Sequence, residues 1–144
     1  MGLDRYQIKK IMENNWIYFG IFFDDAEKKT LIERAKEMGL IPQGWTIFCD
    51  HMTIIFNDRS GKQNVSYLEE SLGKKETLTI SKIGISDRAI AFGVDYKTSN
   101  RQSHITVSII PGGKPVESNN IQKWIKLNTQ FSVEGRLDVV RPRV

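Results

Sequence analysis

The sequence predicts an α+β protein, and three observations lead to this fold class. The chain has 144 residues, which suits one compact domain with its own core. Short runs of aromatic and β-branched residues recur along it, alternate with stretches of helical spacing, and are separated by polar turns. Both histidines of the chain lie in such runs, and each is followed two residues later by a threonine. We therefore expect one domain, residues 1–144, whose strands carry the reactive side chains.

The composition is that of a globular protein without internal cross-links. Hydrophobic residues make up 40% of the chain and charged residues 26%, an ordinary balance. No run approaches the roughly 20 apolar residues of a membrane span, and residues 1–15 lack the apolar segment of a secretion signal. The one cysteine, Cys49, excludes an internal disulfide and a cysteine metal cluster. We expect a cytoplasmic monomer with no membrane partner, and the net charge of +4 weakly favours polyanions.

The first half of the chain is expected to alternate strands and helices. Gly20 interrupts an aromatic strand and predicts a place where something approaches the strand's backbone closely. Asp24 or Asp25 is expected to cap a helix that ends at Gly39. In chain order the expected elements are a polar lead-in (residues 1–15), a strand (16–23), a helix (24–39), a turn (41–44), a long strand (45–56), a polar loop (57–64) and a short helix (65–72).

The second half is expected to contain more strands. In chain order we expect a strand (residues 77–85), a turn (86–87), a strand (89–96), a basic connection (97–103), a strand (104–110), a loop (111–120), a helix (121–127), a closing strand (131–140) and a basic tail (141–143). Together the two halves form a coarse repeat, in which each half holds one strand with a His-x-Thr motif. Two similar lobes that face each other would bring the histidines together across a cleft.

The two His-x-Thr motifs carry the strongest functional signal. Residues at positions i and i+2 of a strand point to the same face, so His51 and Thr53 should project together, as should His104 and Thr106. The residues between them should turn into the core. Two imidazoles in one cleft can divide acid and base work near neutral pH. A threonine hydroxyl beside each one can donate a hydrogen bond to a phosphoryl oxygen, and this arrangement needs no metal.

The motifs HMTI and HITV resemble the twin motifs of the two-histidine (2H) phosphoesterases. The stretch HITVSIIPGGKPVESNNI is also similar to the cyclic phosphodiesterase domains of plant and fungal tRNA ligases and related RNA-repair proteins. The resemblance covers about residues 16–140, and it implies a bilobal LigT-like fold with two antiparallel β-sheets, a central cleft and helices packed outside. It also implies a cofactor-free enzyme that opens a 2′,3′-cyclic phosphate of an RNA end or nucleotide to a monophosphate. The histidines are 53 positions apart in the chain, which is closer than we expect for bacterial members.

Several side chains are candidates for substrate binding. Lys114 and Arg101 would grip phosphates, although loop cations are more often solvated. Trp45 and Tyr18 would stack a base, although strand aromatics more often belong to the core. Gly112 and Gly113 directly follow the second motif strand and permit a loop that covers substrate, with a plain turn as the equal alternative. Ser118 and Asn119 are better explained as a helix cap.

Other functions remain open for the same residues. A metal site built from His51, His104 and Asp50 is disfavoured, because Asp50 precedes His51 and faces away from it on a regular strand. A histidine in a strand is usually structural, but the paired motifs argue against that interpretation here. A hydrolase of cyclic oligonucleotide signals, of viral or bacterial anti-defence type, would use the same motifs. A non-catalytic RNA-binding module is the alternative outside enzymes.

Overall fold

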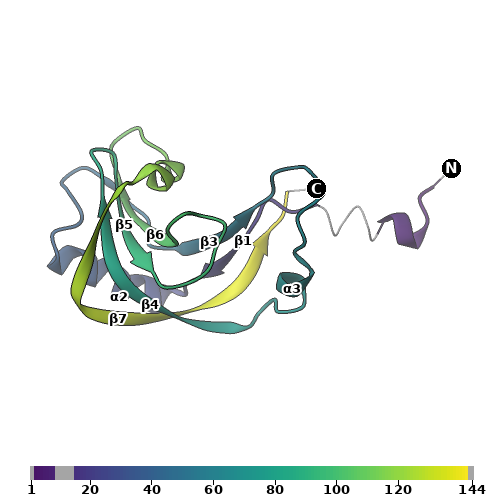
Figure 1. Ribbon diagram of the computed structural model, residues 1–144, viewed down its shortest axis with the longest axis horizontal. Helices are drawn as coiled ribbons and strands as arrows, with labels where there is room; N and C mark the ends of the chain where they lie inside the picture. Colours follow the sequence, from purple (N-terminus) through teal and green to yellow (C-terminus); the bar gives the residue numbers. More distant parts are fainter. Residues whose placement is uncertain (1, 9–14, 143–144) are drawn as a thin grey trace.

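The computed structural model describes residues 2–8 and 15–142, and it is an α+β fold with an antiparallel sheet and few helices (Figure 1). Part of the expected lead-in therefore lies outside the described residues. The strands are β1 (Tyr18–Phe22), β2 (Thr46–Ile47), β3 (His51–Phe56), β4 (Lys75–Ile85), β5 (Ala89–Val94), β6 (His104–Ile109) and β7 (Lys123–Val140). The labelled helices are α2 (Asp25–Glu37), α3 (Ser66–Glu69) and the 3₁₀ helix η1 (Pro115–Asn120), and residues 5–8 near the start of the chain are also helical.

The strands form one sheet rather than the two sheets that we expected. Their order is β2-β6-β3-β1-β7-β4-β5, and β5 also pairs with β6, so the sheet closes on itself (Figure 1). Closure depends on β7, whose 18 residues are long enough to pair with β1 near one end and with β4 along the rest. The two expected halves thus share one sheet, because β7 pairs with β1 of the first half and with β4 of the second.

The first strand and helix agree with the sequence prediction. Asp24 caps α2, where its carboxylate accepts a hydrogen bond of 2.8 Å from the Glu27 amide. Gly39, just beyond the helix, has a φ of +71° as expected for the residue after a cap. α2 packs against the sheet through buried Leu31 and Ala35. The short helix expected at residues 65–72 is present as α3.

The expected strand at residues 45–56 is broken into β2 and β3. Ile47 and Met52 are five positions apart, whereas their partners Ser108 and Ile105 on β6 are three positions apart. The extra residues form a bulge in which Cys49 adopts a φ of +59°. The bulge lets one stretch of chain follow β6 first as β2 and then as β3, which also pairs with β1.

The expected helix at residues 121–127 is wrong, because these residues enter β7. Their apolar positions have helix-like spacing, but pairing with β4 decides the conformation, with Trp124 opposite Gly84 and Ile125 opposite Ile83. The expected closing strand at 131–140 is present as the later part of β7. The loop expected at 111–120 is also corrected, since its second half forms η1. Proline at the first position of η1 favours this helical turn.

The core lies on one face of the motif strands. Met52 and Ile54 of β3 and Ile105 and Val107 of β6 are buried, as the alternation predicts. They join a large apolar cluster that also contains residues of β1, β4, β5, β7 and α2. None of the helices in the described part of the chain is long and apolar enough to cross a membrane. The opposite face of β3 and β6 therefore presents the histidines and threonines.

Candidate active site

All four residues of the two motifs line one cavity of about 240 Å³, which we call the quartet cavity. Its floor is formed by β3 and β6, and η1 lies over one side. The lining comprises Tyr18, His51, Thr53, Phe56, His104, Thr106, Pro115, Val116 and Asn119. The structure thus brings together the catalytic residues that the sequence predicts, on neighbouring strands of one sheet rather than on two separate lobes.

The register between β3 and β6 relates the two motifs by a local twofold symmetry. The middle residues of the motifs, Met52 and Ile105, are paired in an antiparallel ladder. Because the strands run in opposite directions, the residue before Met52 faces the residue after Ile105, and the residue after Met52 faces the one before Ile105. His51 therefore lies across from Thr106, and Thr53 lies across from His104. Side chains at facing positions of adjacent strands are close neighbours. Each imidazole therefore has a threonine on its own strand and another on the facing strand.

The two imidazoles are held by different contacts. His104 Nδ1 lies 2.8 Å from the Gln102 carbonyl oxygen. Because a carbonyl can only accept, Nδ1 carries a proton and Nε2 is left for the cavity. His51 Nε2 lies 3.2 Å from Thr53 Oγ1. Both partners are two residues away along the chain: Thr53 on β3 orients His51, and the loop residue Gln102 orients His104.

Thr106 is held by a residue of η1. Its hydroxyl donates a hydrogen bond of 2.9 Å to Ser118 Oγ. Ser118 is 1% exposed, so this contact is shielded from water. η1 itself is fastened by Glu117, whose carboxylate accepts from the Lys114 amide at 2.8 Å and pairs with Arg88. The segment after the second motif therefore sets the orientation of the threonine that it covers.

Aromatic rings surround His51. Its ring centroid lies 5.2 Å from that of Tyr18 and 5.3 Å from that of Phe22, which is stacked on it at 18°. Phe56 packs on Tyr18 with centroids 5.0 Å apart and is 48% exposed. These rings limit the movement of the imidazole and remove water from its faces. They also give the cavity an apolar wall beside the polar quartet.

Burial lowers the pKa of both histidines. For His51, loss of water is the largest cause, while the charge of Asp50 raises the pKa and that of His104 lowers it. For His104, loss of water again lowers the pKa, and the hydrogen bond to Gln102 opposes it. A proton on His104 therefore disfavours one on His51. The coupling thus disfavours the doubly protonated pair, whereas acid–base catalysis uses the pair that carries one proton.

The four predicted substrate-binding residues lie in different places. Tyr18 lines the quartet cavity. Arg101 is exposed and lines an adjoining cavity on the other side of His104. Trp45 is partly buried and packs on the apolar core, and Lys114 is exposed; neither lines a cavity that contains a motif residue. Of the expected binding residues, the structure thus brings Tyr18 and Arg101 close to the histidines.

Sequence reasoning missed several residues of the site. Phe22 and Phe56 are strand residues whose aromatic character gave no sign of their contact with the site. Ser118 and Asn119 were explained as a helix cap, whereas Ser118 accepts from Thr106 and Asn119 lines the cavity. Trp124 was placed on a helix and in fact lies on β7 beside His104. No alternation in residues 121–127 marks them as a strand, so the sequence carried no local signal for the position of Trp124.

A cluster of metal ligands is not formed by the residues that the structure describes. No three histidine, cysteine, aspartate or glutamate side chains among residues 2–8 and 15–142 come together in a way that could hold an ion. Comparison of the chain with protein-family models and with curated protein sequences finds no match. The case for a function therefore depends on the motifs and on the geometry of the quartet cavity.

Proposed function

We propose that this chain is a cyclic phosphodiesterase of the two-histidine phosphoesterase type. Its substrate is a 2′,3′-cyclic phosphate on an RNA end or a nucleotide, and its product is a monophosphate. The observation that carries the proposal is the antiparallel pairing of the two His-x-Thr motifs, with all four side chains in one cavity. A purely structural role gives no reason for two acid–base groups and two hydroxyls to line the same cavity.

In the proposed reaction the two histidines have separate roles. His104, whose neutral form offers Nε2 as an acceptor, takes a proton from the attacking water. The water oxygen forms a bond to phosphorus while the bond from phosphorus to the 2′ or 3′ oxygen breaks. His51 gives its proton to that leaving oxygen; burial lowers the pKa of His51, and the charge of Asp50 partly offsets this effect. The two proton transfers balance, and no redox partner is required.

The threonines hold the phosphoryl group between acid and base. Hydroxyls of Thr53 and Thr106 donate to the two non-bridging oxygens and stabilise the charge that develops on them. In the free protein the Thr106 hydroxyl gives its one proton to Ser118 Oγ, so on substrate binding the Ser118 hydroxyl becomes the donor to Thr106 Oγ1 and the Thr106 proton turns to the phosphoryl oxygen. The symmetric positions of the two threonines match the two equivalent oxygens of a cyclic phosphodiester. In this proposal the closed sheet is a compact relative of the LigT-like fold.

A substrate panel tests the proposal directly. The protein is incubated in EDTA with 2′,3′-cyclic AMP, an RNA oligonucleotide that ends in a 2′,3′-cyclic phosphate, 3′,5′-cyclic AMP and a cyclic dinucleotide. We expect the 2′,3′-cyclic phosphates to be opened in the presence of the chelator, because the proposed groups are all side chains of the protein. Product analysis then identifies the monophosphate isomer.

Other results of the same substrate panel would identify one of the alternative functions. Cleavage of the cyclic dinucleotide with the 2′,3′-cyclic phosphates left intact would identify a hydrolase of cyclic oligonucleotide signals. Loss of turnover in EDTA that a divalent ion restores would indicate a metal site. RNA binding with no turnover of any substrate would identify a binding module and would contradict the proposed reaction.

A further inference from the structure

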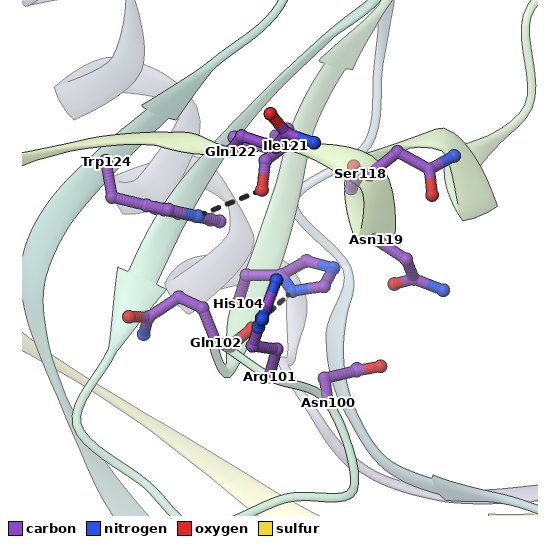
Figure 2. Close-up of a pocket in the computed structure, with 10 residues that line it drawn as sticks. Asn100, Arg101, Gln102, His104, Ser118, Asn119, Ile121, Gln122 and Trp124 are labelled. Atoms are coloured by element: carbon purple, nitrogen blue, oxygen red, sulfur yellow. Dashed lines mark hydrogen bonds between the residues drawn. The ribbon is translucent and has the colours of Figure 1, made fainter.

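A second cavity of about 220 Å³ adjoins the quartet cavity (Figure 2). We call it the Trp124 pocket. It is lined by Asn100, Arg101, Gln102, His104, Ser118, Asn119, Asn120, Ile121, Gln122 and Trp124. His104 and Asn119 line both cavities, so a ligand held between the histidines is next to this pocket. Its wall is mainly side-chain amides, whereas the quartet cavity has an aromatic wall.

One face of the Trp124 ring packs against the backbone at two glycines, Gly84 and Gly93. A Cβ atom at Gly84 would come within 2.5 Å of the indole, and one at Gly93 within 3.3 Å. These glycines lie on β4 and β5, and Gly84 is paired with Trp124 across the sheet. The sheet thus covers one side of the ring, and the opposite side borders the pocket. The Trp124 centroid is 6.2 Å from that of His104.

The indole is also fixed at its edge. Trp124 Nε1 donates to the Ile121 carbonyl oxygen at 3.2 Å, as Figure 2 shows. A tryptophan ring that packs on glycines and donates a hydrogen bond from its nitrogen is already ordered. It therefore loses little conformational entropy when a ligand stacks on it. Aromatic rings of this kind are the usual platform for unpaired bases.

Uncommitted amides surround the platform. Among the described residues, the side chains of Asn100, Asn119 and Gln122 make no hydrogen bonds. By contrast, Gln102 is fully used, since it accepts from Lys82 and donates to two backbone carbonyls. A free amide offers both a donor and an acceptor, which suits the edge of a nucleobase. Arg101 adds an exposed cation at the rim.

We propose that the Trp124 pocket binds the nucleobase of the substrate. The base stacks on Trp124 and hydrogen-bonds to the free amides, while the cyclic phosphate lies between the histidines. This inference rests on the proposed function and adds the place where the nucleobase of that substrate binds. A lipid or a plain sugar phosphate would leave the ring and the amides without a partner.

The catalytic test compares two substrates that share the same five-membered cyclic phosphate. One is 2′,3′-cyclic AMP, and the other is glycerol 1,2-cyclic phosphate, which has no base. Trp124→Ala should lower kcat/KM for 2′,3′-cyclic AMP by about 5- to 100-fold, mostly through KM, as expected for the loss of a stacked base. The same variant should leave kcat/KM for the glycerol substrate unchanged. Trp124→Phe keeps an aromatic ring packed on Gly84 and Gly93 and should retain most of the activity.

Phe56→Ala is the matched control, because Phe56 is the exposed ring on the opposite wall of the quartet cavity. It should leave the preference for 2′,3′-cyclic AMP over the glycerol substrate intact. If Phe56→Ala abolishes that preference and Trp124→Ala does not, the base binds on the other wall. Equal losses on both substrates in Trp124→Ala would show that the ring is structural.

A binding test separates this inference from the proposed reaction. Adenosine 3′-monophosphate is titrated into the protein, and tryptophan fluorescence is recorded for wild type and for Trp124→Phe, with ribose 5-phosphate as the base-free probe. We expect quenching by the nucleotide in wild type that is lost in Trp124→Phe. This result would support the pocket even if no substrate is turned over. Quenching that persists in Trp124→Phe, or that is absent from wild type, would overturn the inference.

Discussion

His104 owes its orientation to the loop that precedes β6. Its Nδ1 donates to the Gln102 carbonyl, and the Gln102 side chain is itself held by three hydrogen bonds, to Lys82, Val94 and Ser103. An imidazole that is 8% exposed can therefore keep one tautomer without a carboxylate partner. A neutral carbonyl costs less to bury than a carboxylate would. Burial lowers the pKa of His104 although the hydrogen bond to Gln102 opposes it, so the ring favours the neutral form that can accept a proton.

Loss of either histidine should remove most of the turnover. We expect His51→Ala and His104→Ala each to lower kcat by about 10²- to 10⁴-fold, because each imidazole transfers a proton. The double variant should lose much less than the product of the two effects, since the pair acts as a unit. Steady-state kinetics on the best 2′,3′-cyclic phosphate give the three values.

Thr46→Ala is a suitable control, since this exposed residue of β2 touches neither cavity. Its kcat should equal that of wild type. If one histidine variant also keeps near-wild-type turnover, that histidine is structural and the two-histidine reaction is wrong.

The pH dependence of kcat should have its maximum on the acid side of 6.5. Burial lowers the pKa of both histidines from that ordinary value, so the form of the pair with one proton is most populated at lower pH. The rising and falling limbs of this pH profile give apparent pKa values that belong to the pair of histidines rather than to either residue. A rate profile between pH 4.5 and 8 checks this expectation. A maximum well above pH 7 would mean that groups other than these histidines set the limbs.

The shared face of each His-x-Thr motif was predictable because strand alternation is local. Positions i and i+2 share a face whatever the rest of the fold does, so His51 and Thr53 could be placed together from the sequence. Trp124 could not be placed in the same way. Its position depends on pairing with Gly84, which is 40 residues away in the chain. The second cavity is therefore a tertiary feature with no local sign.

Gly20 shows how closely β1 and β3 approach behind the site. A Cβ there would lie 2.8 Å from the Met52 carbonyl oxygen, at a point where the register between the two strands shifts. The sequence prediction of a close backbone approach at Gly20 is confirmed. Because Met52 lies between His51 and Thr53, any movement of its carbonyl is passed to both side chains.

Gly20→Ala should therefore damage both stability and catalysis. The contact is with backbone, which cannot move aside as a flexible side chain can, so β3 must shift. We expect a loss of about 1–3 kcal/mol in the free energy of unfolding and a fall in kcat of at least several-fold. Urea unfolding and steady-state kinetics measure the two effects.

Gly61→Ala provides the comparison. Gly61 has a φ of +72° but open space around it, so alanine there strains the backbone without displacing a neighbour. It should lower stability and leave kcat unchanged. If Gly20→Ala behaves in the same way, β3 absorbs the extra methyl without moving the motif.

The errors in the predicted elements have a common cause. The helix expected at residues 121–127 and the unbroken strand expected at 45–56 were both inferred from local patterns. In the structure, partners far along the chain decide both segments: β4 holds residues 123–126 extended, and β6 imposes the bulge at Cys49. The elements that the sequence predicted well, β1 and α2, carry their own cap and apolar pattern.

Closure of the sheet ties the site to the stability of the protein. β6 pairs with β2, β3 and β5, so the strand that presents His104 and Thr106 also joins the two ends of the sheet. Its other face supplies buried residues to the core. The prediction of two facing lobes was wrong, because closure of the sheet depends on pairing between strands that are distant in the sequence. Local opening of β6 would therefore cost much of the global unfolding free energy.

The histidines should also make stability depend on pH. A histidine whose pKa is lowered in the folded state binds its proton more readily after unfolding. Stability contributed by burial of neutral His51 and His104 is thus fully present above pH 6.5 and is lost as the pH falls below it. Hydrogen bonds lower the pKa values of Asp58 and Glu117, and these carboxyl groups act in a more acidic window near pH 4.

We therefore expect the free energy of unfolding to fall between pH 7 and pH 5.5 and the fall to depend on the histidines. The double variant His51→Gln/His104→Gln keeps polar side chains of similar length but cannot titrate in this range. Urea unfolding at several pH values should give a clear slope for wild type and a much flatter one for the variant, because the slope measures protons taken up on unfolding. Equal slopes would mean that the two imidazoles titrate alike in the folded and unfolded chain. In that case burial does not lower their pKa, and the acid-side maximum expected for kcat would lose its physical basis.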